Sequence, residues 1–464
     1  MRSVGPYQAV VTTGIYCRPG CAARPAPANV RSFPLAAAAE AAGYRACLRC
    51  RPYRWEPPPT SAPPELVRRA LRLILEGALD RGTEVQLGAR IGVSPRHLRR
   101  LFDEHLGVSP GQLARSRRAH FARRLLDDTD LGITEIAFAA GFGSVRQLNR
   151  AFLEIFRATP SKLRARRRAS DRLAADGGLP IRLPVSGPLE WDLMLDYLGR
   201  RAIPGVELVT AGTYRRTILI DGDPGVIELS RMSADTLLLR AHLPHWEGLI
   251  DIVSRARRIF NLDGDALAAA DRLSGDPHVG PLMARRPGLR PPGAWDGFEV
   301  GVRAIVGQQV SVSGATALVG RIVQRHGRQV PGLAPMGLTH LFPEAPVLAT
   351  ADLDGLGMPR SRTEAIRQFA AAVGDHRLHL EQRCPLDQLV AQVMDLPGLG
   401  PWTAHYLALR LGEPDALPAS DLGLRRALAK GGALPTPRQV AELAAGWHPF
   451  SAYAAVQLWL AGTA

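Results

Sequence analysis

Four cysteines near the start of the chain have the types and spacing of a metal site. Cys17 and Cys21 form one pair, and further along the chain Cys47 and Cys50 form a second pair in a C-x2-C motif. Two close pairs on separate turns can bring four thiolates into a tetrahedron, the ligand arrangement of closed zinc sites. We therefore predict a zinc site; the alternative is two chance pairs of reduced thiols. Cys384 is isolated and is predicted to be a lone thiol.

A glycine turn and an aspartate in the C-terminal part of the chain could bind DNA and do chemistry on it. Residues 396–404 predict a helix, a turn containing Gly398 and Gly400, and a second helix. Glycines let backbone N–H groups approach a phosphate at the positive end of a helix, so this helix-hairpin-helix predicts non-specific backbone binding. Asp421 comes after this second helix and a loop that contains Gly and Pro. A carboxylate there could stabilise oxocarbenium character on deoxyribose, or orient a water, while a base–sugar bond breaks.

Simpler roles compete for the acidic residues in this region. Asp395 and Asp415 lie near the hairpin in sequence and are predicted to be solvated or capping residues. Asp421 could itself be the N-cap of a helix that begins after Ala419-Ser420.

The hairpin followed by a Gly/Pro-rich loop and an aspartate resembles the base-excision glycosylase superfamily. Within it, residues 180–464 resemble the AlkA family of alkyl-base glycosylases. The motifs that carry the resemblance are Trp191 with Pro204–Glu207, Tyr214–Arg216, Phe298-Glu299, Arg303–Ser311 and Tyr453 with Trp459. The resemblance implies that Asp421 is the catalytic residue and that aromatic side chains line a pocket for a flipped, alkylated base.

The matching aromatic residues here are Trp402, Tyr406 and Trp459. An electron-rich face suits a cationic base such as 3-methyladenine, through stacking and cation–π attraction. For each of the three, ordinary core packing is the alternative.

Departures from the AlkA family refine the expected chemistry. The family's wedge into the base stack is apolar, whereas Gln309 stands at the matching position, so hydrogen bonding to the orphan base could support flipping. Bifunctional relatives carry a Schiff-base lysine where Trp402 stands, and the only lysines here are Lys162 and Lys430. We therefore expect a monofunctional enzyme that leaves the abasic site uncut. The residues predicted to wedge or contact DNA are Gln308, Gln309, Gly398, Gly400 and Thr403.

The resemblance also bears on cofactors at this site. No four-cysteine cluster follows Asp421, so no iron–sulfur cluster is expected. In the family, the carbonyl groups of the hairpin can hold a monovalent cation, which is expected here by resemblance alone.

Two segments, 87–102 and 136–152, repeat a pattern of helix, glycine turn, serine N-cap and helix. In each second helix, apolar residues recur at i, i+3 and i+4, so one stripe should pack inward. The outward faces carry side chains able to read base edges or grip phosphates in a major groove, namely Arg96, His97, Arg99, Arg100, Arg146, Gln147, Asn149 and Arg150.

The two copies, the basic helix expected near 109–126 and the closing Phe156–Ser161 together resemble the AraC-type DNA-binding domain. A single helix-turn-helix is weak evidence because many helix pairs look alike, but two linked copies are specific. The alternative is a helical bundle without DNA contact.

The residues around the cysteines, Thr12–Pro19 and Gly43–Cys50, resemble the N-terminal zinc domain of the Ada family of methylated-DNA sensors. The resemblance implies that Cys17 accepts a methyl group from a DNA phosphotriester. Bound zinc would keep the Cys17 sulfur as a thiolate, which is the nucleophilic form. Methylation of Cys17 removes one negative charge from the metal site. The site then repels the DNA phosphates less, so binding to DNA tightens. The segment before Cys17 is shorter than the one this family usually carries. No Pro-Cys-His-Arg motif occurs, so repair of O6-alkylguanine is not expected.

Local patterns suggest how the chain is divided. Prolines at 57–59 and 63–64 predict a stiff linker, and the basic run 164–168 followed by 176–178 predicts a flexible connector. We expect a multidomain, mainly α protein: a zinc domain at 1–58, an AraC-type double helix-turn-helix at 62–168, an α+β domain like the AlkA N-terminal domain at 179–290, and an all-α helix-hairpin-helix glycosylase domain at 291–464. Residues 217–220 and 236–239 predict strands of the α+β domain.

Composition agrees with a DNA-binding protein. The 464 residues carry 58 Lys+Arg against 43 Asp+Glu, a net charge of +15, which favours a polyanionic partner; a functionally silent basic surface is the alternative. No apolar run is long enough to span a bilayer, no secretory signal is recognised, and five cysteines are too few for a disulfide scaffold. We expect a bacterial cytoplasmic, nucleoid-associated protein, monomeric and away from membranes.

These patterns predict a glycosylase for alkylated bases fused to a methylation-responsive transcription activator. Its partners would be double-stranded DNA, at damaged sites and promoters, and RNA polymerase. Two alternatives stay open: an activator whose glycosylase half is degenerate, and a pure repair enzyme whose helix-turn-helix pair only adds non-specific affinity.

Overall fold

The computed structural model describes residues 6–55, 63–80, 82–167, 171–173, 178–380, 385–429 and 433–462. The chain divides into two compact units: unit 1 comprises Met1–Ser186 and Thr236–Arg255, and unit 2 comprises Gly187–Asp235 and Ala256–Ala464. The proline linker at 57–59, the connector residues 168 and 174–177, Cys384 and Lys430 lie outside the described residues. The four-domain division stays a prediction, since the observed division is coarser and assigns 236–255 to unit 1.

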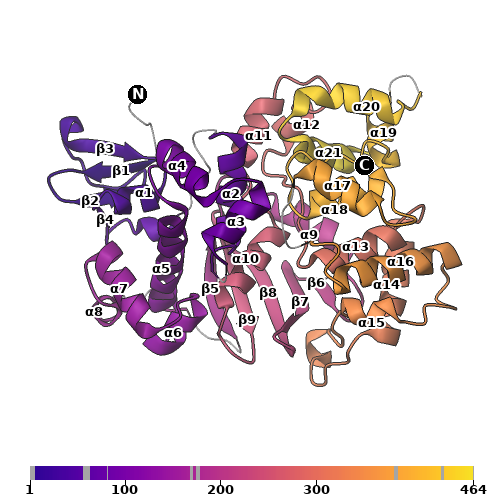
Figure 1. Cartoon of the computed structure of the whole chain (residues 1–464), viewed down its shortest axis with the longest axis horizontal. Helices are drawn as coiled ribbons and strands as arrows, with labels where there is room; N and C mark the ends of the chain where they lie inside the picture. The colour runs from indigo at the N-terminus through magenta and orange to yellow at the C-terminus, as the bar shows by residue number, and fades with distance from the viewer. Residues whose placement is uncertain are drawn as a thin grey trace. The chain divides into compact units, whose positions relative to one another are not determined.

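Unit 1 begins with a small sheet that carries the cysteines (Figure 1). Its strand order is β3-β1-β2-β4, and the register pairs Gln8 with Cys17. Strand β2 therefore delivers Cys17 directly, and the parallel strand β4 runs into Cys47. The elements are β1 (Tyr7–Val10), β2 (Ile15–Cys17), β3 (Val30–Phe33), α1 (Ala36–Ala41) and β4 (Arg45–Ala46), with short 3-10 turns η1 (Pro27–Asn29) and η2 (Pro52–Arg54).

The repeated motifs form as predicted. Ser94 caps α4 by accepting a hydrogen bond from the His97 N–H at 3.2 Å, and Ser144 caps α7 in the same way. Leu98 and Phe102 are fully buried, as are their counterparts in α7, which confirms the inward stripe. The helices are α2 (Glu65–Leu75), α3 (Glu84–Ile91), α4 (Pro95–Leu106), α5 (Pro110–Asp128), α6 (Ile133–Ala139), α7 (Val145–Phe156) and α8 (Pro160–Ala165).

The rest of unit 1 is a two-stranded ladder and part of a helix. Strand β5 (Leu179–Pro184) pairs antiparallel with β9 (Thr236–His242), which contains the strand predicted at 236–239. Helix α10 (Leu249–Ile259) follows. Arg182 on β5 bonds Asp128 at the end of α5 at 2.6 Å, so an ion pair joins the ladder to the helix-turn-helix region.

Unit 2 combines an antiparallel meander with a helical body. Strands β6 (Glu207–Thr210), β7 (Thr213–Ile220) and β8 (Asp223–Ser233) pair in sequence order, and β7 contains the predicted strand 217–220. The helices are α9 (Trp191–Gly199), α11 (Ala266–Leu273), α12 (Gly280–Arg285), α13 (Gly297–Val306), α14 (Val312–His326), α15 (Ala345–Ala349), α16 (Arg360–Gly374), α17 (Leu386–Met394), α18 (Pro401–Arg410), α19 (Leu422–Ala427), α20 (Pro437–Ala444) and α21 (Ser451–Ala461), with 3-10 turns η4 (Ala334–Met336) and η5 (Ala445–Trp447).

One apolar core fixes these helices around α13. Almost every residue of α13 is buried, and Gly301 lets the Phe369 ring of α16 lie against its backbone, where a Cβ would meet that ring at 2.1 Å. Leu407 of α18 and Leu458 of α21 belong to the same core. Packing on one core brings helices that are far apart in sequence side by side, so polar residues near their ends can build a shared site.

A buried ionic network joins this core to the meander. Arg216 of β7 bonds Glu299 of α13 at 2.6 Å, and Arg303, one turn further along α13, bonds Glu207 of β6 at 2.8 Å. Tyr214 donates to Glu207 at 2.6 Å. Burial alone would raise the pKa of Glu207, but the two arginines outweigh it and hold the pKa at about 2. All charges are matched, so the network fixes α13 against the strands.

The mainly helical, multidomain architecture confirms the predicted fold class. No helix among the described residues is long and apolar enough to cross a membrane.

Candidate functional site

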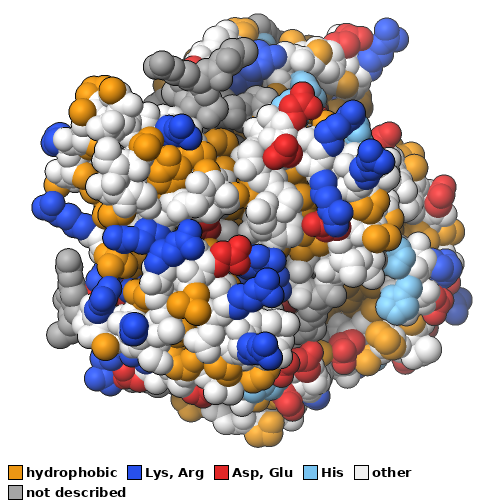
Figure 2. Space-filling model, turned by 60° about the vertical axis from the view of Figure 1, so that its left-hand side comes forward, with side chains coloured by type: hydrophobic (Ala, Val, Ile, Leu, Met, Phe, Trp, Pro, Cys, Tyr) orange, Lys and Arg blue, Asp and Glu red, His pale blue; other side chains and the backbone are white. Residues whose placement is uncertain are grey.

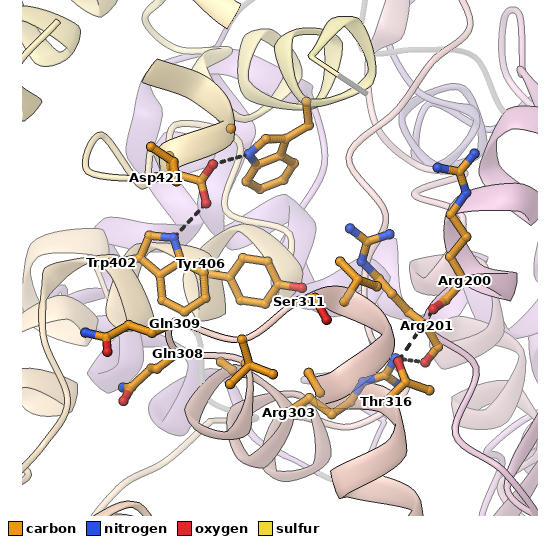
Figure 3. Close-up of a pocket in the computed structure, with 18 of the residues that line it drawn as sticks. Arg200, Arg201, Arg303, Gln308, Gln309, Ser311, Thr316, Trp402, Tyr406 and Asp421 are labelled. Carbon is orange, nitrogen blue, oxygen red and sulfur yellow. Dashed lines mark hydrogen bonds between the residues drawn. The ribbon is translucent and has the colours of Figure 1, made fainter. Parts of the chain in front are cut away.

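A cleft of about 1180 Å³ opens in unit 2, and the candidate residues of the glycosylase motifs gather around it (Figure 3). Its walls come from the end of α9, the turn between α13 and α14, the hairpin before α18, the start of α19 and the end of α21. Asp421, Trp402, Tyr406 and Trp459 all line it. Residues far apart in sequence therefore share one cavity.

The Asp421 carboxylate has three N–H donors around it. Its Oδ2 accepts from the Trp402 indole at 2.8 Å, and its Oδ1 accepts from the Trp459 indole at 2.9 Å and from the Leu424 backbone N–H at 3.0 Å. The last bond makes it the N-cap of α19. Asp421 therefore caps α19 and also lies in the cleft, so the two roles do not exclude each other. No arginine or lysine among the described residues pairs with this carboxylate, so its negative charge stays available to a cation.

The three aromatic residues form one group. The rings of Trp402 and Tyr406 stack with centroids 5.2 Å apart at 12°, and Trp459 lies 6.1 Å from Tyr406 at 54°. All three are half-buried, and Tyr406 and Trp459 also pack against the apolar core, so their faces are open to a ligand in part. The rival acids lie elsewhere: Asp395 is exposed at the end of α17, and Asp415 accepts hydrogen bonds from Ser451 and His448 at 2.6 Å.

The hairpin has the conformation that its glycines predict. Gly398 has φ +81°, a left-handed conformation that disfavours other residues, and Gly400 is the N-cap of α18 without a side-chain cap. The amide of Gln308 donates to the Gly398 carbonyl at 3.1 Å and to the Thr403 hydroxyl at 3.0 Å. The Thr403 side chain is buried. Gln308 and Thr403 thus join the hairpin to the α13–α14 turn.

Gln309 is placed differently from its neighbour. It is exposed on the edge of the cleft and adopts a left-handed backbone with φ +57°, which is uncommon for a residue other than glycine. Arg362 donates to the carbonyl of Gln308 at 2.6 Å, directly before this position. The side chain is therefore presented to solvent from a fixed turn.

Sequence reasoning missed one wall of the cleft, which Tyr197, Arg200 and Arg201 line, and the buried Arg410 beside it, which does not itself line the cleft. Arg201 lies over the ring of Tyr197 at 3.8 Å, and the buried Arg410 donates to the Tyr406 hydroxyl at 3.1 Å. Burial would raise the pKa of Tyr406, but Arg410, Arg201 and Arg303 together lower it to about 8. The adjacent Arg200-Arg201 pair was the only sequence signal, and it did not indicate which side chain faces the cleft.

The predicted metal ligands come together in unit 1. The sulfurs of Cys17, Cys21, Cys47 and Cys50 all lie within 4.8 Å of one another. Sulfurs around a tetrahedral zinc at Zn–S of about 2.3 Å would be about 3.8 Å apart, so a small contraction gives a complete site.

Hydrogen bonds join the cysteine sheet to α5, and the sequence did not indicate them. Tyr16, next to Cys17, donates to Glu40 at 2.5 Å, and His120 of α5 bonds the same oxygen at 2.6 Å. Tyr53, shortly after Cys50, donates to the buried Asp127 of α5 at 2.8 Å. Both cysteine pairs thus lie beside contacts to the helix that links the two helix-turn-helix motifs.

The predicted DNA-contacting residues of α4 and α7 differ in availability. The five arginines of the set, Arg96, Arg99, Arg100, Arg146 and Arg150, are all exposed, and Arg99 also pairs with Glu84 at 2.5 Å. Elsewhere in the set, Arg100 bonds the half-buried His97 at 3.1 Å, Gln147 accepts from the Gly143 N–H at 3.0 Å, and Asn149 is half-buried. Figure 2 shows several separate groups of Lys and Arg side chains on the face of the molecule in view.

Three protein-family models match the chain, in the order expected. The metal binding domain of Ada matches residues 7–53, a helix-turn-helix domain matches 87–166, and the AlkA N-terminal domain matches 180–296. These matches confirm the resemblances read from the motifs.

Similar proteins match most of the chain. The probable bifunctional transcriptional activator/DNA repair enzyme AlkA of Mycobacterium tuberculosis is 40% identical over 97% of this chain and 92% of its own length. DNA-3-methyladenine glycosylase 2 of Escherichia coli is 32% identical over 59% of this chain and 94% of its own length. The structure of the 3-methyladenine DNA-glycosylase of Archaeoglobus fulgidus covers 61% of this chain and 98% of its own, with TM-score 0.53 and 23% identity, which shows a shared fold.

Proposed function

The chain belongs to the same family as the bifunctional AlkA proteins of Mycobacterium tuberculosis, and we propose that it hydrolyses the N-glycosidic bond of alkylated DNA bases and also regulates transcription. The observation that carries the enzymatic half is the Asp421 carboxylate, which faces an aromatic cleft and has no cationic partner among the described residues. The substrate class is the 3-methyladenine type, as for the Escherichia coli relative.

Asp421 would act on the sugar. As the base leaves, positive charge develops on the deoxyribose, and a carboxylate held in place beforehand stabilises it without reorganisation. Two indole N–H groups and the Leu424 N–H aim the carboxylate but cancel little of its charge, because they are neutral dipoles. Water then attacks the sugar. No lysine is among the described residues that line the cleft, which supports the proposal that no Schiff base forms and that the abasic site stays uncut.

The damaged base would leave the duplex to reach this carboxylate. Trp402, Tyr406 and Trp459 offer ring faces on which a flipped base can stack. We propose that Gln309, exposed on the edge of the cleft, fills the gap in the stack and that the hairpin N–H groups hold a phosphate. The monovalent cation at the hairpin remains an expectation from the resemblance.

Replacement of the carboxylate tests the enzymatic half. Asp421→Asn in the full chain should lower release of 3-methyladenine from methylated DNA by about 10³-fold, while binding to undamaged DNA is unchanged. Asp395→Asn, an exposed acid beside the same hairpin, is the matched control and should retain full activity. Equal activity of the two variants would contradict the proposal.

We further propose that the four cysteines hold zinc and that Cys17 accepts methyl groups. Bound zinc would keep the four sulfurs as thiolates. The Cys17 sulfur then forms a bond to the methyl carbon of a phosphotriester, the carbon–oxygen bond breaks, and the phosphate oxygen keeps the electron pair. Cys17 is only 7% exposed, so little of its surface is accessible to a phosphotriester.

Mass spectrometry of the protein after incubation with methylphosphotriester DNA tests this transfer. A methyl group should be found on the peptide that contains Cys17, and only when zinc is bound. Methylation of Cys21, Cys47 or Cys50 instead would refute the assignment.

The regulatory half rests on the paired helix-turn-helix motifs with their exposed arginines. We propose that they bind promoter DNA more tightly after methylation and that the bound protein, a cytoplasmic monomer, contacts RNA polymerase. Footprinting with and without methylation of Cys17 should show a defined protected site that strengthens on methylation. Uniform, sequence-independent protection would contradict the regulatory role.

A further inference from the structure

We propose that His120 is a positioning residue, which holds the cysteine sheet, strands β1 to β4, on α5 so that methylation of Cys17 changes how α4 and α7 bind promoter DNA. This inference rests on the proposed function, because it requires methyl transfer to Cys17 and promoter binding. The loss of charge at the cysteines would then tighten binding fully only while the sheet is fixed to the helix-turn-helix region.

Two sets of contacts form a joint between this part of the chain and α5, and the first lies next to Cys17. Tyr16 is fully buried and donates to Oε1 of Glu40 at 2.5 Å, and Nε2 of His120 bonds the same oxygen at 2.6 Å. The side chains of Glu40 and His120 are 6% and 14% exposed, so water competes little for these bonds. The other oxygen of Glu40 is buried and has no hydrogen-bond partner among the described residues. The oxygen shared with α5 therefore makes all the hydrogen bonds that the structure gives this carboxylate.

The second set of contacts follows the second cysteine pair and includes both α5 and α7. Tyr53 is 2% exposed and donates to Asp127 of α5 at 2.8 Å. Its ring meets Phe156, the last residue of α7, edge-on with centroids 6.0 Å apart. The His120 ring contacts both of these rings, at 6.4 Å from Tyr53 and 5.9 Å from Phe156. One aromatic group therefore joins the cysteine segment to α5 and to a recognition helix.

Ion pairs fix the segment after Cys50 to the end of α5. Arg54 pairs with Asp128 at 2.8 Å and with Asp127 at 3.3 Å. Arg51, directly after Cys50, lies 3.7 Å from Asp127. Both aspartates are buried, so salt screens these pairs less than it screens pairs on the surface. The chain that carries the second cysteine pair is thus held at several points along one face of α5.

The joint reaches the helices that would contact the promoter. Helix α5 packs against both α1 and α7 (Figure 1), and Arg157 at the end of α7 donates to the Gly43 carbonyl, in the turn before β4, at 3.3 Å. The sheet and the second recognition helix are therefore in direct contact as well as joined through α5.

The range of electrostatic forces explains why this position matters. Repulsion between exposed charges falls off over about 10 Å at about 0.1 M ionic strength, so the charge at the cysteines affects binding only when it is held close to a DNA phosphate. Two DNA-contacting surfaces that are fixed to each other also bind together without the entropy cost of ordering a tether. If the joint is broken, methylation of Cys17 still occurs but adds less to promoter binding.

The test measures the Kd for promoter DNA before and after methylation of Cys17, with the zinc-loaded full chain, and takes the ratio of the two. His120→Leu removes the bond to Glu40 but leaves the bond between Tyr16 and Glu40. It should lower the ratio about 10-fold, the effect of losing one charge-assisted hydrogen bond, while mass spectrometry still finds the methyl group on Cys17. A merely structural loss would weaken both forms equally and leave the ratio unchanged.

Two further variants separate the joint from general damage to α5. His120→Gln places an amide N–H near the position of the ring Nε2 and should retain most of the ratio. Glu154→Gln is the matched control, because Glu154 also bonds a side chain of α5, Arg115 at 3.2 Å, but from α7 and not from the cysteine sheet. It should leave the ratio unchanged.

Tyr53→Phe tests the second set of contacts with the ring packing kept, because it removes only the bond to Asp127. It should lower the ratio about 3- to 10-fold, and it decides alone should His120→Leu fail to hold zinc. An unchanged ratio in His120→Leu and Tyr53→Phe, with methylation retained, would overturn the inference while leaving the proposed function intact. Failure of the unaltered protein to accept the methyl group, or to bind the promoter more tightly afterwards, would instead contradict the proposed regulation, and this inference with it.

Discussion

The metal cluster of unit 1 and the cleft of unit 2 are built in opposite ways. The four cysteines come from residues 17–50 and bring one kind of atom to one point. The cleft draws its lining from residues 193–462, and its opposite charges, Asp421 and Arg201, stand apart on either side of an aromatic ring. The cluster can be completed by a single ion, whereas the cleft depends on the packing of several helices.

This contrast teaches what stabilises each site. Four thiolates repel one another unless a metal ion neutralises them, so the cluster should depend on its ligand. The cleft is held by an apolar core and by matched buried charges, so its shape needs no ligand. Removal of metal and removal of a buried charge should therefore affect different halves of the chain.

The largest expected effect is the loss of metal. A chelator, or Cys47→Ser, should unfold the cysteine sheet, because structural zinc contributes about 10 kcal/mol to the folding of small metal domains. Limited proteolysis should then cut within residues 6–55, while base release by the cleft continues. Cys384→Ser makes the same chemical change outside the four-cysteine cluster and should have no such effect. Loss of base release on chelation would break the comparison.

A smaller effect is expected from the buried network of unit 2. Arg216→Met leaves Glu299 and Glu207 with one arginine between them and should destabilise this unit by about 3 to 5 kcal/mol. Thermal unfolding measures this loss of stability. Promoter binding is the second readout, and it should persist because unit 1 binds the DNA.

The control for Arg216 is an exposed ion pair in the same unit. Arg438→Met removes the partner of Glu442 on the surface of α20 and should cost no more than about 0.5 kcal/mol. Similar losses in both variants would show that the buried network does not hold the cleft.

The next largest effect is expected from the indole N–H groups that donate hydrogen bonds to Asp421. Trp402→Phe keeps a ring but removes the N–H bonded to the carboxylate, and it should lower base release about 10- to 100-fold. Trp447→Phe removes the same kind of indole–carboxylate bond, to Asp276 at 2.8 Å, away from the residues that line the cleft. It should lower stability without a specific loss of base release.

The smallest effect concerns pH. Tyr406 should titrate with a midpoint near pH 8 in the ultraviolet absorbance of tyrosinate, and Tyr406→Phe should remove this transition. Because its pKa lies below the unfolded value of about 10, the unfolded chain binds more protons between these values. Stability should therefore gain a contribution as pH rises from 8 to 10 and lose it as pH falls. Arg410→Met should move the midpoint upward; an unmoved midpoint would remove Arg410 as the cause.

Sequence patterns predicted the parts that depend on neighbours in the chain. The serine caps of α4 and α7, the left-handed Gly398 and the gathering of four cysteines follow from local spacing, and the structure contains them. Asp421 was singled out by its place after the hairpin, and the structure puts it in the cleft. Its catalytic role stays a prediction.

Other features could not be predicted because they exist only between distant segments. Nothing around Tyr16 indicates that His120 will bond the same glutamate, and nothing around Asp127 indicates Tyr53. Likewise, Arg200 and Arg201 look equivalent in sequence, yet a carboxylate one turn back neutralises the first and the ring of Tyr197 orients the second.

The sequence by itself determined which chemical groups the chain has and which local turns and caps display them, because these depend on residue type and short-range hydrogen bonds. Only the tertiary structure decided that a carboxylate and a guanidinium, each without an ionic partner among the described residues, stand on opposite sides of one tyrosine. Long-range packing of α9, α18, α19 and α21 sets that separation, which no local pattern encodes.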